Sequence, residues 1–313
     1  MMLLAPIPWA ARVWALPFLS ALCPSQRYHD SEGRRHKKLT DWARQRVKQV
    51  HRWLPNRPIV IVADSAFAAP DFLGAARQHA TIITRLRLDA ALYAPAPERL
   101  PGQRARTRLK GERLPALSEV LADPVTAWTP LIVPCWYGEQ DRAVEVVSGT
   151  AVWYHPGMAP IELRWVLIRD PPKQFESQAL LCTDSQATPA FSLDCFVQRW
   201  QVEVTFEEAR AHLGVQTQRQ WSDKAIVRTT PCLLALYSLV TLAAQDMFAA
   251  GQLYRRCAAW YLKPQATFSD TIACVRGDLW SHAYFSTSHD EVDVVKIPRP
   301  LVDRFIDSLC YAA

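Results

Sequence analysis

A short apolar run followed directly by an aspartate constrains the fold of this chain most. Residues 58–63 form a continuous, largely β-branched run, which is typical of a strand covered on both faces. Asp64 follows at its carboxyl end, residues 67–79 have a helical pattern, and residues 81–86 form a second strand-like run. This order predicts an α/β fold, in which ligands bind outside the carboxyl ends of strands. Asp64 therefore lies in the right place for chemistry, although an aspartate here can equally cap the next helix.

The amphipathic stretch from Pro189 to Leu213 predicts one long helix. At about 100° per residue, its apolar side chains fall on one stripe that forms the core face. The members of this stripe are Cys195, Val202, Phe206, Ala209 and Leu213.

A neighbouring arc of the same predicted helix, about 60° wide, carries Phe196, Arg199, Glu203 and Arg210. One aromatic ring, two guanidiniums and a carboxylate would then share a face. By spacing alone, a solvated face with local ion pairs is the favoured interpretation. Glu207 stands three residues before Arg210, and such pairs stabilise helices by about 0.2–0.5 kcal/mol.

The composition is that of a globular chain with a mild positive charge. Half of the 313 residues are hydrophobic, and the net charge of +6 permits a nucleic-acid partner without requiring one. The eight cysteines show neither Cys-x-x-Cys spacing nor a zinc pattern, so we expect reduced thiols and a cytosolic protein.

The apolar N-terminal stretch is interrupted by Arg12 and by three prolines. We therefore expect a strand or hairpin of the central sheet there, with a strand at residues 13–22, rather than a signal peptide or a membrane span. No other stretch reaches about 18 uncharged apolar residues, so no membrane span is expected.

Residues 37–54 predict a helix with a polar, basic outer face. Residues 95–115 form a Pro-rich basic loop, for which a solvated linker is the favoured interpretation and a phosphate-tracking loop the alternative.

Strand-like runs and turn signals make the following part β-rich up to residue 183. Further helices are expected at residues 229–249, 254–262 and 268–279, with no clear signal from residue 290. Four tryptophans of the β-rich part are expected in the core rather than as base-stacking platforms: Trp128, Trp136, Trp153 and Trp165.

The pattern Phe196-x2-Arg199-x3-Glu203-x6-Arg210 resembles the Y-x2-R-x3-E-x6-K signature of DDE insertion-sequence transposases. The Arg-Trp-x-x-Glu core, with the later Gln-Arg-Gln-Trp-Ser-Asp-Lys-Ala run, is similar to one bacterial branch of these enzymes across most of the chain. Phenylalanine replaces the tyrosine at 196 and loses its hydrogen bond. Arginine replaces the lysine at 210, which keeps the charge but changes the geometry.

The resemblance implies a ribonuclease-H-like α/β fold: a mixed sheet flanked by helices, interrupted by an all-β insertion and followed by C-terminal helices. Residues 1–87 would be the first, incomplete part of the catalytic core, and residues 88–186 the β-rich insertion. Residues 187–313 would contain the glutamate helix and the C-terminal helical region.

The resemblance also implies strand cleavage and strand transfer at insertion-sequence ends, with two Mg²⁺ ions, or Mn²⁺, held by carboxylates. Asp64 would be the second aspartate and Glu203 the glutamate, both of them catalytic metal ligands. Phe196, Arg199 and Arg210 would contact DNA. The implied partners are the double-stranded inverted-repeat ends, the target DNA and a second copy of the chain. No membrane is involved, and the expected location is the bacterial cytoplasm, at the nucleoid when DNA is bound.

The family's first aspartate has no clear counterpart, because it should lie on an earlier strand. Asp30 and Asp41 fall in a predicted loop and near a predicted helix start. The family's N-terminal DNA-binding region is missing as well, so we expect an N-terminally truncated transposase that is inactive by itself. One alternative is a catalytically inactive fragment that binds DNA or full-length transposase as an inhibitor. Another is an unrelated nuclease with the same core, against which the signature argues.

Overall fold

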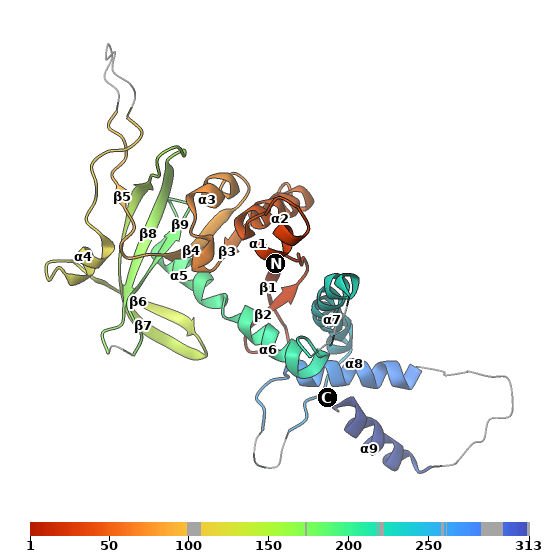
Figure 1. The fold of residues 1–313 in the computed structure, drawn as a ribbon. Helices are drawn as coiled ribbons and strands as arrows, with labels where there is room; N and C mark the ends of the chain where they lie inside the picture. The colour runs from red at the N-terminus through yellow and green to blue at the C-terminus, as the bar shows by residue number, and fades with distance from the viewer. Residues whose placement is uncertain are drawn as a thin grey trace. The chain divides into compact units, whose positions relative to one another are not determined.

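The computed structural model describes residues 1–98, 108–172, 174–217, 219, 222–257, 260, 262–282 and 297–311. Contacts divide the chain into two compact units, whose elements are labelled in Figure 1. The larger unit comprises residues 23–200, and the smaller unit comprises residues 1–22 and 201–313. The three-part division at residues 87 and 186 stays a prediction.

The larger unit is built on a mixed sheet, which has seven strands among the described residues. The order is β3-β4-β9-β8-β7-β5, and β6 pairs with β7 beside this path. The β3–β4 pair is parallel and the pairings of the other named strands are antiparallel. The strands are β3 (Val60–Val62), β4 (Thr81–Leu86), β5 (Leu92–Tyr93), β6 (Thr129–Trp136), β7 (Glu139–Trp153), β8 (Ile161–Arg169) and β9 (Gln178–Cys182).

Side chains of β4 are buried on both faces of this sheet. Ile82 packs in one core cluster with Phe72 and Leu73, while the next residue, Ile83, packs in another with Leu193. Adjacent strand residues point to opposite faces, so helices α3 and α5 cover opposite sides of the sheet. The helices of this unit are α1 (Gln26–Ser31), α2 (Leu39–Trp53), the 3₁₀ helix η1 (Ser65–Phe67), α3 (Pro70–Ala76), α4 (Leu117–Ala122) and α5 (Pro189–Gln198). The predicted mixed sheet flanked by helices is confirmed.

The β-rich middle of the chain extends the sheet that already holds β3 and β4. Strand β9 pairs with β4, with Thr84 opposite Leu181, and β8 and β7 follow in a meander. Gly149 on β7 lies opposite Trp165 on β8. A Cβ atom at residue 149 would stand 2.8 Å from the indole ring, so glycine is required by the close approach of this side chain.

The smaller unit packs helices on a short hairpin. Strands β1 (Met2–Pro6) and β2 (Val13–Pro17) form their own two-stranded antiparallel sheet. The helices are α6 (Gln201–Leu213), α7 (Asp223–Ala249), α8 (Phe268–His282) and α9 (Arg299–Cys310). Trp14 packs with Tyr237 and Phe268, whose rings stack at 4.0 Å between centroids.

The expectation that the N-terminal hairpin belongs to the central sheet is wrong. The hydroxyl of Thr205 on α6 donates a 2.8 Å hydrogen bond to the backbone carbonyl of Ala15, and Ser238 on α7 donates one of 2.7 Å to Pro17. Helix hydroxyls thus satisfy carbonyl groups at the edge of β2 that another strand would otherwise bind.

The single helix expected from Pro189 to Leu213 is also wrong, because it is broken at Arg199 and Trp200. The N–H groups of these two residues bond three residues back, to Phe196 and Val197, which tightens the chain into a turn. Phe196 and Val197 belong to the core of the larger unit, whereas Thr205 binds the hairpin of the smaller unit. Packing in two separate cores has overridden the continuous helical pattern.

One expectation for the C-terminal third fails as well. Residues 254–257 are not helical, and three residues of the predicted 254–262 helix (258, 259 and 261) lie outside the described part. Helix α9 forms where no signal was seen. Helix α7 is long and apolar enough to cross a membrane by length and composition alone, and the expectation that the chain has no membrane span stays a prediction. Its Tyr237 and Ala244 are buried in the core of the smaller unit, whereas Leu239 and Leu242 on the same helix are 60% and 62% exposed.

Candidate functional site

Asp64 lies two residues beyond Val62, the last residue of β3. Its carboxylate oxygen Oδ1 accepts a 2.6 Å hydrogen bond from the backbone N–H of Ser65, so the capping role that the sequence allowed is confirmed. The buried hydroxyl of Thr84 on β4 donates to the backbone carbonyl of Asp64 at 2.8 Å. The residue is exposed, and its second carboxylate oxygen has no hydrogen bond among the described residues. An exposed carboxylate with one oxygen unused fits the hard oxygen ligands that Mg²⁺ prefers.

Phe196 lies at the end of α5 and is only 2% exposed. The guanidinium carbons of Arg85 and Arg199 lie 5.8 and 5.9 Å from the centroid of its ring, close to the limit for cation–π attraction. The ring therefore packs in the core beneath two arginines. Its predicted contact with DNA stays a prediction.

Tyr137, in the turn between β6 and β7, joins this group. Burial raises the pKa of its phenol, while the charges of Arg85 and Arg199 act in the opposite direction. Its ring packs edge-on against Trp200, with centroids 5.7 Å apart. Sequence reasoning missed Arg85 and Tyr137, because only the pairing of strands brings them to the end of α5, and no spacing along the chain signals it.

Glu203 and Arg210 lie on α6 and are both exposed. They stand seven residues apart, so they project from nearly the same face, two turns from each other. The guanidinium of Arg210 donates a 3.4 Å hydrogen bond to the side-chain oxygen of Gln216. This part of the predicted arc is preserved, because it falls within one helix.

The five predicted site residues are thus divided between the units. Asp64, Phe196 and Arg199 belong to the larger unit, and Glu203 and Arg210 to the smaller. Within the described part of the chain, no three His, Cys, Asp or Glu side chains are grouped so as to hold a metal ion. A joint metal site formed by Asp64 and Glu203 therefore stays a prediction.

The basic loop is described only in part, since residues 99–107 lie outside the described residues and include Arg99, Arg104 and Arg106. Its far side returns along β5, where Tyr93 bridges to Arg113. The ammonium of Lys110 lies 3.3 Å from the ring centroid of Tyr93 and 4.8 Å from that of Tyr154. This cation is therefore held against aromatic rings.

A mixed sheet between helices, with an aspartate at the carboxyl end of a parallel strand, places the larger unit in the ribonuclease-H-like class of folds. Residues 1–146 match the family model described as DDE superfamily endonuclease. The predicted relationship to the DDE superfamily is thereby confirmed over these residues, which include Asp64. The match ends before Phe196, so the signature itself stays a prediction. No curated protein matches the chain.

Proposed function

We propose that this protein is a DNA transposase of the DDE type, which cleaves and transfers DNA strands at insertion-sequence ends. The observation that carries the proposal is the position of Asp64. It follows the carboxyl end of β3 in a sheet of the expected class, inside the residues that match the DDE superfamily endonuclease model. Catalytic side chains of α/β sheets lie at this edge.

In this proposal, Asp64 and Glu203 would hold Mg²⁺, or Mn²⁺ in its place. The metal ions would supply Lewis-acid stabilisation of the attacking and leaving oxygens. Arg199 and Arg210 would bind phosphates of the transposon end. The buried ring of Phe196 would contribute to DNA binding indirectly, by packing against the guanidinium of Arg199.

The proposal is tested by metal binding of residues 1–313, measured by calorimetry with Mn²⁺, and not only by activity. Asp64→Asn should weaken binding at least tenfold, because it removes a charged ligand. Asp71→Asn is a matched control, since Asp71 also accepts a hydrogen bond from the backbone N–H of the next residue but lies at the start of α3. Equal loss of Mn²⁺ binding in both variants would refute the assignment of Asp64.

A second candidate function is supported by the strands that precede β3. Neither β1 nor β2 contains an acidic residue, so no strand-borne carboxylate stands for the first aspartate there. Asp41 is on α2 and pairs with Arg44. Residues 1–313 would then bind inverted-repeat DNA, or an intact transposase, as an inhibitor without cleaving DNA.

The two functions are separated by one assay with the element's own inverted-repeat duplex and Mg²⁺. Under the second function, residues 1–313 bind the duplex, leave it intact and lower the rate at which an intact transposase nicks it. Nicking that Glu203→Gln abolishes would instead establish the chain as an active enzyme. Terminal inverted repeats flanking the gene would argue against an unrelated nuclease with the same core.

The partners follow from this function and are part of the proposal. They are duplex DNA at the inverted repeats and at the target, with a second copy of the chain in the active complex. We propose a location in the bacterial cytoplasm, at the nucleoid when the protein is bound to DNA, because that is where such a substrate lies.

A further inference from the structure

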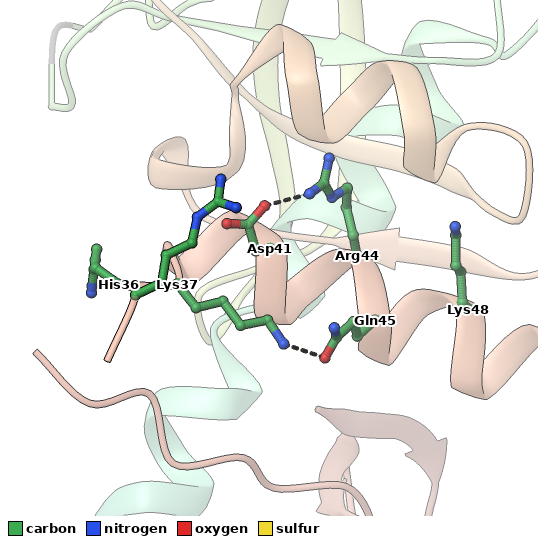
Figure 2. A pocket seen from close by; sticks show the side chains of 7 residues that line it. His36, Lys37, Asp41, Arg44, Gln45 and Lys48 are labelled. Carbon is green, nitrogen blue, oxygen red and sulfur yellow. Dashed lines mark hydrogen bonds and ion pairs between the residues drawn. The ribbon is translucent and has the colours of Figure 1, made fainter. Parts of the chain in front are cut away.

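A pocket of about 530 Å³ lies beside α2, and Asp64, the predicted catalytic residue of this unit, is not among the residues that line it. It is lined from two directions, by the segment that leads into α2 and by one face of the helix. The helical members recur at positions i, i+3, i+4 and i+7, which is the spacing of a single helix face. Figure 2 shows the lining side chains as sticks and labels all of them except Arg35. The full lining is Arg35, His36, Lys37, Asp41, Arg44, Gln45 and Lys48.

The charge of this pocket is strongly one-sided, with four lysine and arginine side chains against one carboxylate. That carboxylate is already engaged. Asp41 pairs with Arg44, as Figure 2 shows, and it also accepts a 3.2 Å hydrogen bond from the backbone N–H of Lys38. It therefore contributes little to neutralising the remaining cations.

Three of the four cations have no acidic partner among the described residues. Lys37 donates to the side-chain oxygen of Gln45 and lies 3.7 Å from the ring centroid of Trp42. Arg35 and Lys48 are exposed, and neither makes an ion pair within the residues that the structure describes. They are consequently available to an anion without first breaking an internal interaction.

One end of the pocket, at Arg35, His36 and Lys37, also lies at the positive end of a helix dipole. Helix α2 has 15 residues, and the segment with Arg35 and Lys37 leads into its first turn. The backbone dipoles of such a helix favour negative charge near its N-terminus. The dipole and the side-chain charges thus act in the same direction.

We propose that this pocket binds backbone phosphates of duplex DNA, as a DNA contact separate from the predicted catalytic residues. This inference rests on the proposed function, because it takes DNA to be the substrate. The helical part of the lining extends over about 10 Å from Asp41 to Lys48. Each DNA strand presents one phosphate per about 3.4 Å of helix axis, so the row faces more than one phosphate.

The chemistry of the lining predicts binding without sequence preference. The lining contains no Phe, Tyr or Trp ring on which a base could stack, and its donors are mainly long, flexible cations. Phosphate contacts fix the position of a duplex but carry no sequence information. The pocket therefore suits DNA that varies in sequence, such as flanking or target DNA.

The experiment is a measurement of DNA affinity against salt concentration, by fluorescence anisotropy with a short duplex of random sequence. Wild-type residues 1–313 are compared with Arg35→Ala/Lys48→Ala between about 50 and 200 mM salt. Each lost phosphate contact reduces the magnitude of the slope of log K against log salt by about 0.9. The slope of the double variant should therefore be smaller in magnitude than that of the wild type by about 1.8. Both side chains are exposed, so folding should be unaffected, and circular dichroism checks this.

A charge-matched control is Arg27→Ala/Arg57→Ala, which removes two exposed arginines outside the pocket. Each double variant lowers the net charge from +6 to +4. The control should keep most of the wild-type slope. If both double variants lost the same amount of salt slope, only the net charge would matter, and the proposal that this pocket binds DNA would be wrong. If the alanine variant folds poorly, Arg35→Gln/Lys48→Gln provides the same comparison.

Titration with inorganic phosphate forms the second arm. If phosphate binds the wild type but not the pocket variant, while both have the same DNA slope, the pocket takes a free phosphate and the DNA assignment is wrong. A wild-type chain that binds no DNA at low salt would instead contradict the proposed function. The two failures are therefore distinguishable.

Discussion

The hydroxyl of Thr84 donates a 2.8 Å hydrogen bond to the backbone carbonyl of Asp64. Thr84 lies on β4 and is fully buried, and the adjacent backbone bond from Ala63 to Ile83 measures 2.9 Å. The position of Asp64 is thereby fixed by the neighbouring strand as well as by its own.

Thr84→Val tests this relationship. The valine has the same shape but leaves the carbonyl of Asp64 without its partner, which should cost about 1–3 kcal/mol of folding free energy. Urea denaturation measures the change. Thr81→Val is the control, because the hydroxyl of Thr81 on the same strand makes no hydrogen bond among the described residues. Similar losses in both variants would show that the bond to Asp64 contributes nothing specific.

Arg199→Ala and Arg210→Ala should each weaken binding to inverted-repeat DNA and lower the salt slope by about 0.9, the value of one phosphate contact. Anisotropy titrations at several salt concentrations measure both quantities. Arg27→Ala serves as an exposed control. A salt slope that is unchanged in both variants would contradict the predicted phosphate contacts.

Asp270 should make the smaller unit sensitive to acid. Burial acts to raise the pKa of its carboxyl, but hydrogen bonds from the backbone N–H groups of Thr267 and Arg256, and from Lys263, lower it on balance. The group's contribution is then fully present above the unfolded pKa of about 3.9, and is lost as the pH falls through the lower folded pKa.

Asp270→Asn should therefore cost about 3 kcal/mol at pH 7, because it leaves the Lys263 ammonium without its charged partner. The difference from the wild type should shrink as the pH falls below about 4. Asp303→Asn, which breaks an exposed pair with Arg299, should cost less than about 1 kcal/mol. Denaturation curves at several pH values measure these differences, and a constant gap across the range would contradict the pKa assignment.

Gly149→Ala should destabilise the sheet by about 1–3 kcal/mol, because its methyl group would overlap the indole ring of Trp165. Gly74→Ala should instead stabilise the protein by about 0.5–1 kcal/mol, since it lies within α3 and a methyl group there meets nothing within 4 Å. Thermal melting of the two variants should move in opposite directions. Loss of stability in both would mean that the space beside Gly74 is needed.

The strand–Asp–helix order was predictable because each of its elements has a short, local signal. The run before Asp64 is β-branched and the following helix begins at Pro70, so period and composition suffice. The hairpin at Ala15 was assigned to the wrong sheet, because hydroxyls 190 and more residues away satisfy its edge. The group around Phe196 depends on the pairing of strands, which spacing along the chain does not encode.

The break between α5 and α6 changes how substitutions in the signature should be interpreted. The turn at Arg199 and Trp200 lies within the motif and separates α5 from α6, which pack in different core clusters. Trp200 packs against Tyr137 and carries no reactive group. A loss of activity on replacing Trp200 would then report an altered backbone path rather than missing chemistry. The signature from Phe196 to Arg210 consists of two parts that pack in different cores. Its spacing in the sequence therefore does not by itself fix the positions of its side chains.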